Sequence, residues 1–281
     1  TVFSSKARNI LLELGELNWK HINPDIFGSM IQAVVVPEYR NDLGMHYTSV
    51  PNILKLIKPL FLDELYEAFE KHHNNAAQLR KLIARISKIK FFDPACGSGN
   101  FLIITYKELR VLEIKIIQQI IALEKIPLFA DAFTSSISLN QFYGMELDDF
   151  AHEMAILSLW LAEHQMNRVF DEQLEGYGKS KPILPLKQAG KIVQGNAART
   201  DWKEVCPISK DEEVYIIGNP PYLGARMQDK EQKMDMAIVF HGINGYNNMD
   251  YISCWFFKAK NYIEGFNAKA AFVTTNSICQ G

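Results

Sequence analysis

The sequence predicts an α/β fold with a doubly wound, mostly parallel sheet and an N-terminal helical segment. From residue 89 onward, short apolar runs alternate with long stretches of helical periodicity. The apolar runs end in glycine, proline, acid or amide residues. Alternation of this kind favours a parallel sheet that binds its ligands at the carboxyl ends of the strands.

Helical periodicity dominates the residues before this region. Apolar side chains recur at helical spacing on either side of Asn23-Pro24, which reads as a cap and a first-turn proline. A turn containing GMHYTS (residues 44–49) follows, and the next helical stretch is interrupted by Pro59. We expect residues 1–43 to form a helical spacer and residues 44–281 to form the catalytic domain.

The most basic stretch of the chain is residues 71–90, which contain six Lys or Arg residues and no acid. Leu79, Leu82 and Ile86 share one face of the predicted helix, and the cations lie on the other. A solvated helix face is the main interpretation, and contact with nucleic-acid phosphate is the secondary one.

Five strands and three long helices are expected in the alternating region. The expected strands are IKFFDP, NQFYGMEL, KIVQGN, EVYIIGN and KAAFVTTN. The expected helices cover residues 101–125, 148–166 and 249–266, with loops at about 171–188 and 223–247.

Composition and charge restrict the class of protein. The 281 residues are 48% hydrophobic with a net charge of −2, which predicts a globular protein and offers no general sign of nucleic-acid binding, although a local basic patch would permit it. The four cysteines are far apart, so the sequence suggests neither a disulfide framework nor a metal site. A reducing cytoplasm is the simplest compartment for such a chain. No run is long and apolar enough to cross a membrane, and no secretory signal is recognisable. We expect the chain to be a segment of a longer protein.

The first predicted strand ends in DPACGSGN, residues 93–100. Its glycines allow a ligand to approach the backbone, and the following helix can offer free N–H groups. A P-loop needs Gly-Lys-Ser/Thr, but Gly99 is followed by Asn100. A dinucleotide fingerprint needs a glycine where Leu102 stands. The turn therefore favours neither a nucleoside triphosphate nor a nicotinamide cofactor.

Acids at two neighbouring strand ends suggest S-adenosylmethionine. Asp93 would repel a pyrophosphate and suits an ammonium group, and Glu146 ends the second strand, where a carboxylate can accept from both ribose hydroxyls. Taken alone, either acid could be a turn residue or a helix cap, and Asp148 and Asp149 are the expected caps. S-adenosylmethionine carries an ammonium group and a ribose but no phosphate, so it suits both positions.

The fourth predicted strand runs directly into Asn219-Pro220-Pro221-Tyr222. An amino group on a heteroaromatic ring is a poor nucleophile because its lone pair is delocalised. The Asn219 amide oxygen and the Pro220 carbonyl can accept from its N–H groups and favour a pyramidal nitrogen. Tyr222 can stack on a planar substrate, a contact that contributes about 1–3 kcal/mol per base. Alignment of nitrogen and methyl group contributes roughly 7–11 kcal/mol.

In isolation these four residues could be a strand-terminating turn with a packing aromatic ring. Their position downstream of the glycine-rich turn and of Glu146 favours amino methylation instead. The sequence alone leaves DNA, RNA and glutamine open as substrates of the Asn-Pro-Pro-Tyr site.

Together the motifs resemble the gamma class of adenine-N6 DNA methyltransferases, and most closely the MmeI-like (type IIL) restriction–modification family. DPACGSGNF resembles motif I, YGMEL motif II, VQGNA motif III and GNPPY motif IV of that class. GMHYTS resembles the motif that closes over the methionine end of the cofactor, and MDYISCWFFKA and AAFVTTNSICQG resemble motifs V and VI. The closing motif precedes motif I and motif IV follows it, which is the gamma order. The resemblance implies a Rossmann-like class I methyltransferase that uses S-adenosylmethionine.

The resemblance assigns a role to each matched position. Cofactor contacts are implied for Tyr47, Thr48, Asp93, Ala95, Cys96, Gly97, Gly99, Glu146, Leu147, Asn196, Ala197 and Asn219. Within this set, Glu146 would hold the ribose and Leu147 would lie beside the adenine. Many relatives have Asp where Asn196 stands. Catalytic contacts with a flipped target base are implied for Asn219, Pro220, Pro221 and Tyr222.

Partners are also implied by the resemblance. Double-stranded DNA is the expected substrate, and nuclease and target-recognition domains are expected elsewhere in the parent chain. Glu113-Ile114-Lys115 is rejected as a nuclease site because it lies inside a predicted helix without a partner Asp. Two alternatives remain: a glutamine or RNA amino-methyltransferase with the same site, and a non-catalytic fragment that binds cofactor or braces other domains.

Overall fold

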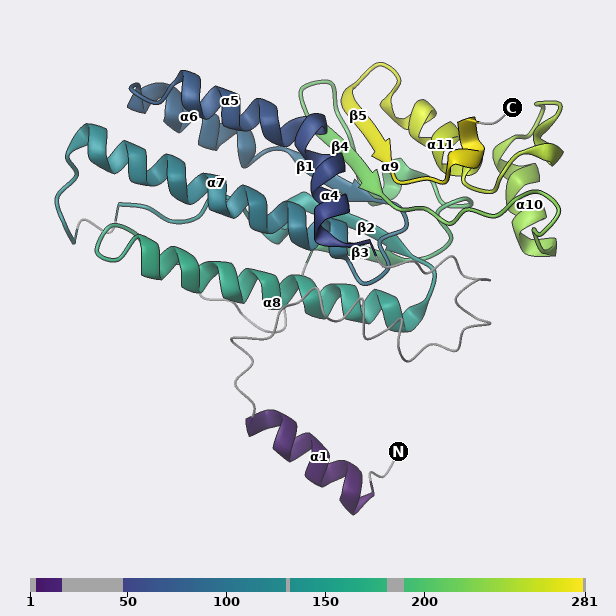
Figure 1. Cartoon of the computed structure of the whole chain (residues 1–281), viewed down its shortest axis with the longest axis horizontal. Helices are drawn as coiled ribbons and strands as arrows, with labels where there is room; N and C mark the ends of the chain where they lie inside the picture. The colour runs from purple at the N-terminus through teal and green to yellow at the C-terminus, as the bar shows by residue number, and fades with distance from the viewer. Residues whose placement is uncertain (1–3, 17–47, 130–131, 181–189, 280–281) are drawn as a thin grey trace.

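The five expected strands form one parallel sheet in the order β3-β2-β1-β4-β5 (Figure 1). The structure, a computed structural model, describes residues 4–16, 48–129, 132–180 and 190–279. Its strands are β1 (Lys90–Asp93), β2 (Phe142–Glu146), β3 (Lys191–Gln194), β4 (Glu213–Gly218) and β5 (Asn267–Phe272). β1 pairs with both β2 and β4, so the strand order reverses beside it, which is where doubly wound sheets bind ligands. The predicted fold class is confirmed.

Helices cover both faces of the sheet (Figure 1). One face carries α4 (Val50–Ile57), the π-helix η2 (Lys58–Leu62), α5 (Asp63–Lys71), α6 (Ala76–Ile86), α7 (Asn100–Glu124) and α8 (Asp149–Gln173). The other face carries α9 (Trp202–Val205), α10 (Lys230–Val239) and α11 (Ser253–Ile263). The remaining described elements are α1 (Ser5–Glu16) and the short 3₁₀ turns η3 (Leu139–Gln141), η4 (Tyr246–Asn248) and η5 (Asn276–Cys279).

The pleat of β1 divides the hydrophobic core into two clusters. Phe91 stacks on Phe142 of β2 at 5.3 Å between ring centroids. Phe92 points to the opposite face and meets Trp202 edge to face at 5.4 Å. Both phenylalanines are fully buried. Successive side chains of a strand point to opposite faces, so a strand covered on both sides must be apolar throughout.

The helical stretch around Pro59 continues without a break and changes locally to a π-helix. Proline has no N–H to donate within the helix, and η2 carries Pro59 in its first turn. The wider turn closes with the N–H of Asp63 donating to the carbonyl of Lys58. The interruption expected at Pro59 is therefore a local change of hydrogen-bond register.

The polar loop expected at residues 223–247 was wrong in its middle, where α10 forms. A capping box begins this helix: Asp229 Oδ1 accepts from Gln232 N at 2.8 Å, and Gln232 Oε1 accepts from Asp229 N at 3.0 Å. Asp followed by Gln three residues later is a readable start signal, and it was missed because the apolar residues that follow it show little helical periodicity. α9 was also missed, and α8 continues to Gln173, beyond the expected end.

The cations of α6 make contacts within the molecule. Arg80 pairs with Glu124 of α7, and Arg85 bridges Glu64 and Glu213 at 2.8 Å each. Three of the six cations of the basic stretch therefore have acidic partners, since Lys90 also pairs with Glu212. The interpretation of the stretch as a solvated helix face stays a prediction.

Asp148 caps α8 as expected, because its Oδ1 accepts from Ala151 N at 2.8 Å.

Several expectations fall outside the described residues. These are the helix expected after Asn23-Pro24, the GMHYTS motif up to Tyr47, and the loop around residues 181–189. Within the described part of the chain, no helix is long and apolar enough to cross a membrane. Cys96, Cys206 and Cys254 are buried and unpaired.

Candidate functional site

The carboxyl ends of β1, β2 and β4 bring the predicted site residues together at one edge of the sheet. β1 ends at Asp93 and β2 ends at Glu146. β4 ends at Gly218, immediately before Asn219. A Cβ atom built on Gly218 would lie 2.5 Å from Asp93 Oδ1. Glycine at this position therefore makes room for the Asp93 carboxylate beside the end of β4.

The turn between β1 and α7 needs two left-handed glycines. Gly97 and Gly99 have φ values of 54° and 85°, and Gly99 is the N-cap of α7. The turn is fastened to β2, because Cys96 N donates to the carbonyl of Met145 at 2.9 Å. Trp255 of α11 fastens it from the other face by donating to the Pro94 carbonyl at 3.1 Å. The backbone of this turn is thus held rigidly at the sheet edge.

Asp93 is a fully buried acid with an incomplete set of partners. Its Oδ1 accepts from Ala95 N at 3.0 Å, whereas its Oδ2 is buried without a hydrogen-bond partner. Burial, together with the nearby charge of Glu146, raises the pKa of Asp93 to about 8. An unpartnered buried carboxylate oxygen needs an explanation, and a cationic ligand group would supply one.

Glu146 is held by three backbone N–H groups. Its Oε2 accepts from Gly97 N at 2.8 Å, and its Oε1 accepts from Leu147 N and Asp148 N at 2.9 Å each. Burial nevertheless raises the pKa of Glu146. Leu147, the next residue, is 56% exposed and offers an apolar surface beside the carboxylate.

Asn219 and Thr48 are 171 residues apart in the sequence and in contact in the structure. Asn219 Nδ2 donates to Thr48 Oγ1 at 3.1 Å, and Thr48 is itself buried. Asn219 Oδ1 is buried without a partner. The bond to Thr48 engages the amide nitrogen, so the amide oxygen is left available as an acceptor.

The residues after Asn219 continue as an extended turn. Pro220 is buried, and Pro221 and Tyr222 are half-buried. Burial raises the pKa of the Tyr222 phenol. The start of the turn is fixed by β5, because Val273 N donates to the Gly218 carbonyl at 2.9 Å.

Two residues absent from the predicted site hold the segment behind Tyr222. Asp250 Oδ1 accepts from Leu223 N at 2.9 Å, and Gln228 Nε2 donates to the Leu223 carbonyl at 3.1 Å. Gln228 also donates to the Met249 carbonyl at 3.0 Å. The contacts of Asp250 with Leu223 and of Gln228 with Met249 join positions more than twenty residues apart, so no local sequence signal could reveal them.

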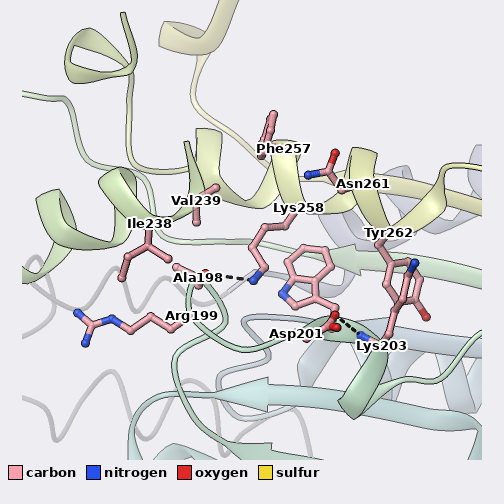
Figure 2. A pocket seen from close by; sticks show the side chains of 11 residues that line it. Ala198, Arg199, Asp201, Lys203, Ile238, Val239, Phe257, Lys258, Asn261 and Tyr262 are labelled. Atoms are coloured by element: carbon pink, nitrogen blue, oxygen red, sulfur yellow. Dashed lines mark hydrogen bonds between the residues drawn. The ribbon is translucent and has the colours of Figure 1, made fainter. Parts of the chain in front are cut away.

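Asn196, at the motif III position, is engaged on both sides of its amide. Its Nδ2 donates to Asp235 Oδ2 at 2.9 Å, and its Oδ1 accepts from Ala198 N at 2.8 Å. Lys258 of α11 donates to the carbonyl of Ala198 at 3.1 Å (Figure 2). It also donates to the carbonyl of Thr200 at 2.6 Å. The turn after β3 is therefore held by both α10 and α11. Ala197 is buried beneath it.

A pocket of about 410 Å³ opens between α9, α10 and α11, behind this turn (Figure 2). Arg199, Lys203 and Lys258 line it together with aromatic rings. Arg199 is already paired with Asp235 and Glu231, and Lys258 binds two carbonyls. Two of its cations thus have protein partners, and we assign the pocket no ligand.

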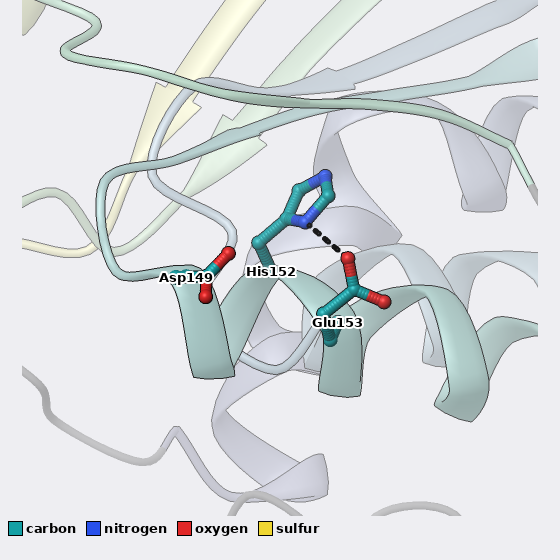
Figure 3. Close-up of side chains that lie close together, drawn as sticks. All are labelled: Asp149, His152 and Glu153. Atoms are coloured by element: carbon teal, nitrogen blue, oxygen red, sulfur yellow. Dashed lines mark ion pairs between the residues drawn. The ribbon is translucent and has the colours of Figure 1, made fainter. Parts of the chain in front are cut away.

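Asp149, His152 and Glu153 lie close together in the first turns of α8 (Figure 3). Both acids are exposed. One ring nitrogen of His152 is 3.3 Å from Glu153 Oε1, and the other is 3.3 Å from the Ile192 carbonyl. Only the Nε2 atom has a hydrogen-bond partner, and Nδ1 makes none. Since exposed acidic groups are common without a bound ion, we assign no metal to this cluster.

The structure thus places the described members of the predicted site at one sheet edge or on the turns that leave it. Tyr47 lies outside the described residues. A family model that describes the DNA-methyltransferase domain of MmeI matches residues 69–281. The chain belongs to the MmeI DNA-methyltransferase domain family. The resemblance inferred from the motifs is confirmed, and membership of the MmeI family implies a methyl donor as cofactor.

Individual relatives of this MmeI-family domain agree. DNA methyltransferase A of Bacillus subtilis (strain 168) is 54% identical over 280 residues, which are 99% of this chain and 31% of that protein. A putative type II restriction enzyme and methyltransferase of Methanocaldococcus jannaschii is 30% identical over 168 residues, 50% of this chain and 14% of that protein.

Among solved structures, the type IIL restriction-modification enzyme MmeI in complex with DNA superposes with a TM-score of 0.86 and 40% identity. The match covers 99% of this chain and 37% of MmeI. The chain therefore spans about a third of the length of MmeI and of DNA methyltransferase A. Because the family model begins at residue 69, a domain boundary at residue 44 stays a prediction.

Proposed function

We propose that this domain transfers a methyl group from S-adenosylmethionine to adenine N6 in DNA, as part of a restriction–modification protein. The observation that carries the proposal is the pair of unpartnered buried oxygens, Asp93 Oδ2 and Asn219 Oδ1. They lie at the ends of adjacent strands, one suited to a ligand cation and the other to a ligand N–H. Burial of an oxygen acceptor without a partner costs free energy, and a bound ligand that donates to these two oxygens would remove that cost.

The residues at the sheet edge suit S-adenosylmethionine. Asp93 would accept from its ammonium group, and the backbone of residues 95–99 would surround its methionine part. Thr48 can accept from Asn219 and still donate its own O–H to a carboxylate. The motif that contains Tyr47 also implies a contact of this residue with the methionine part, which stays a prediction. When bound, the cofactor supplies an electrophilic methyl group.

The nucleoside end of the cofactor has its own candidate contacts. Glu146 Oε2 accepts one backbone N–H and retains a lone pair for a ribose hydroxyl, whereas Oε1 already accepts two backbone N–H groups. Leu147 and Ala197 would pack on the adenine ring. Because both sides of the Asn196 amide have protein partners, we assign it to shaping the adenine turn and only secondarily to accepting from the adenine.

The catalytic task falls to the amide and the carbonyl at the end of β4. Asn219 Oδ1 and the Pro220 carbonyl accept from the two N–H groups of the target amine, which localises its lone pair for attack. Thr48 fixes the orientation of the amide, so that its oxygen and not its nitrogen faces the substrate. Pro221 stiffens the turn and Tyr222 stacks on the flipped base. The nitrogen becomes cationic as the bond forms, and its proton then leaves without a strong base.

DNA is favoured over RNA and glutamine by the relatives. MmeI was solved in complex with DNA, and DNA methyltransferase A is 54% identical. The matches cover about a third of DNA methyltransferase A and of MmeI. Nuclease and target-recognition domains are proposed to accompany this domain in a longer parent chain.

The test is methyl transfer from tritiated S-adenosylmethionine to DNA from a strain that lacks adenine methylation. Asn219→Ala should lower kcat by at least about a hundredfold, since it removes a preorganised acceptor from the reacting atom. Gln141→Ala, which removes a buried side-chain amide immediately before β2 and away from the carboxyl edge, serves as the matched control and should keep transfer within about tenfold. Unchanged transfer in Asn219→Ala would refute the assignment of the base site.

A further inference from the structure

Asp235 is a buried acid of α10 that belongs to none of the motifs, and it is only 2% exposed. Three side chains donate to its carboxylate. Asn196 Nδ2 lies 2.9 Å from Oδ2, Tyr251 Oη lies 2.6 Å from Oδ2, and Arg199 Nε lies 2.5 Å from Oδ1. These donors come from two separate segments of the chain.

Asn196 and Arg199 belong to the turn after β3. This turn is one hydrogen bond away from the proposed ribose site, because Gly195 N donates to the carbonyl of Glu146 at 2.8 Å. Within the turn, Arg199 N donates to the Asn196 carbonyl at 3.0 Å. Asp235 therefore fixes the segment proposed to face the cofactor adenine.

The third donor, Tyr251, belongs to the segment that fixes the base site. Its backbone N–H donates to the Leu223 carbonyl at 2.9 Å. The preceding residue, Asp250, accepts from Leu223 N at 2.9 Å. Leu223 directly follows Tyr222, the proposed stacking ring. A short series of hydrogen bonds thus joins the Asp235 carboxylate to the base site.

We propose that Asp235 is a positioning residue that couples cofactor binding to target-base binding. The inference rests on the proposed function and adds a pathway between its two ligands. Cofactor binding would order the turn after β3 around Asp235, and this order favours the conformation of the segment behind Tyr222 that binds the target base. Binding of the base favours cofactor binding to the same extent, because coupling between two binding equilibria is reciprocal. The simpler alternative is that Asp235 only stabilises α10.

Glu113 supplies the matched control for that alternative. It is also a buried acid at 1% exposure, and it accepts from Ser135 Oγ at 2.7 Å and from Ser136 N at 2.6 Å, beside Arg110. Its partners lie on α7 and the loop before β2, away from the site edge. Glu113→Gln should lower stability without changing the effect of DNA on cofactor affinity.

The experiment measures the affinity of the intact protein for S-adenosylhomocysteine with and without unmethylated bacterial genomic DNA, together with kcat and KM for methyl transfer. We expect DNA to tighten binding by at least about fivefold in the wild type and in Glu113→Gln, within the range typical of coupled sites. In Tyr251→Phe and Asp235→Asn we expect DNA to tighten the binding of S-adenosylhomocysteine by less than about twofold. We also expect kcat to fall about tenfold in both variants, with a smaller change in the KM for S-adenosylmethionine.

Tyr251→Phe removes one hydroxyl and keeps the ring, so it provides the test if Asp235→Asn does not fold. Full coupling in Tyr251→Phe, or no coupling in the wild type, would overturn the inference. Failure of the wild type to methylate the DNA would instead contradict the proposed function. The coupling measurement needs no turnover, so it decides the role of Asp235 in either case.

Discussion

Asp93 and Asp235 are both buried acids near the same sheet edge, yet their surroundings differ. Asp93 has one hydrogen bond to protein, one unpartnered oxygen and a pKa raised to about 8. Asp235 has three donors, one of them an arginine. A buried acid that lacks partners is suited to receive a ligand, whereas one with all its partners holds other residues in place. Substitutions that affect binding and stability separately can test this distinction.

The largest effect is expected for Gly218→Ala. The added Cβ would lie 2.5 Å from Asp93 Oδ1, so the Asp93 carboxylate must be displaced, or β4 must shift, at the point where both ligands are proposed to bind. We expect overpacking to lower the free energy of unfolding by about 1–3 kcal/mol. Methyl transfer should fall by more than about a hundredfold. Thermal denaturation and the transfer assay measure the two effects, and wild-type values for both would show that the strand ends are not tightly packed.

Asp93→Asn should affect binding much more than stability. It removes the negative charge proposed for the cofactor ammonium group, and a hydrogen bond to a charged group contributes about 1.5–3 kcal/mol. Affinity for S-adenosylmethionine should therefore fall about tenfold or more in calorimetry, with little loss of thermal stability. Asp235→Asn should do the opposite and lower stability first. If Asp93→Asn and Asp235→Asn both lowered affinity more than stability, or both lowered stability more than affinity, the distinction between the two acids would be wrong.

Asn196→Asp should destabilise the protein, although it restores the acid found in many relatives. The new carboxylate would face Asp235 at the 2.9 Å contact where the amide now donates. Leaving a buried acceptor unsatisfied costs about 1–3 kcal/mol. The double variant Asn196→Asp/Asp235→Asn supplies a donor again and should recover part of the loss. A double-mutant cycle in urea measures the coupling, and strict additivity would mean that the two side chains do not interact.

The most gradual effect is the pH dependence of stability due to Asp93. Its pKa is raised from 3.8 to about 8 by folding, so the folded state binds more protons than the unfolded state between these values. Stability without ligand is therefore lost as the pH rises from about 4 to about 8, by at most about 1.4 kcal/mol per pH unit. The contribution is the difference between the wild type and Asp93→Asn in urea denaturation. A difference that stays constant over this range would contradict the raised pKa.

Sequence patterns identified those parts of the site that depend on local chemistry. The glycines at 97 and 99, the acid at Glu146 and the Asn-Pro-Pro-Tyr turn follow apolar strands, and parallel strands must end at one edge. Contacts between distant segments could not be predicted in this way. Thr48 was predicted as a cofactor contact, whereas the bond that it makes here is to Asn219. Asp235 was assigned to a loop because the helix that carries it has little amphipathic pattern.

The sequence by itself determined the fold class, the family and the residue types at the strand ends, because apolar alternation and turn composition act over a few residues. Only the tertiary structure decided which polar atoms have partners. Asp93 Oδ2 and Asn219 Oδ1 are left free, and the Asn196 amide is engaged by Asp235. Hydrogen-bond satisfaction depends on groups from distant segments that meet within about 3 Å, and this proximity exists only once the sheet and its helices have packed.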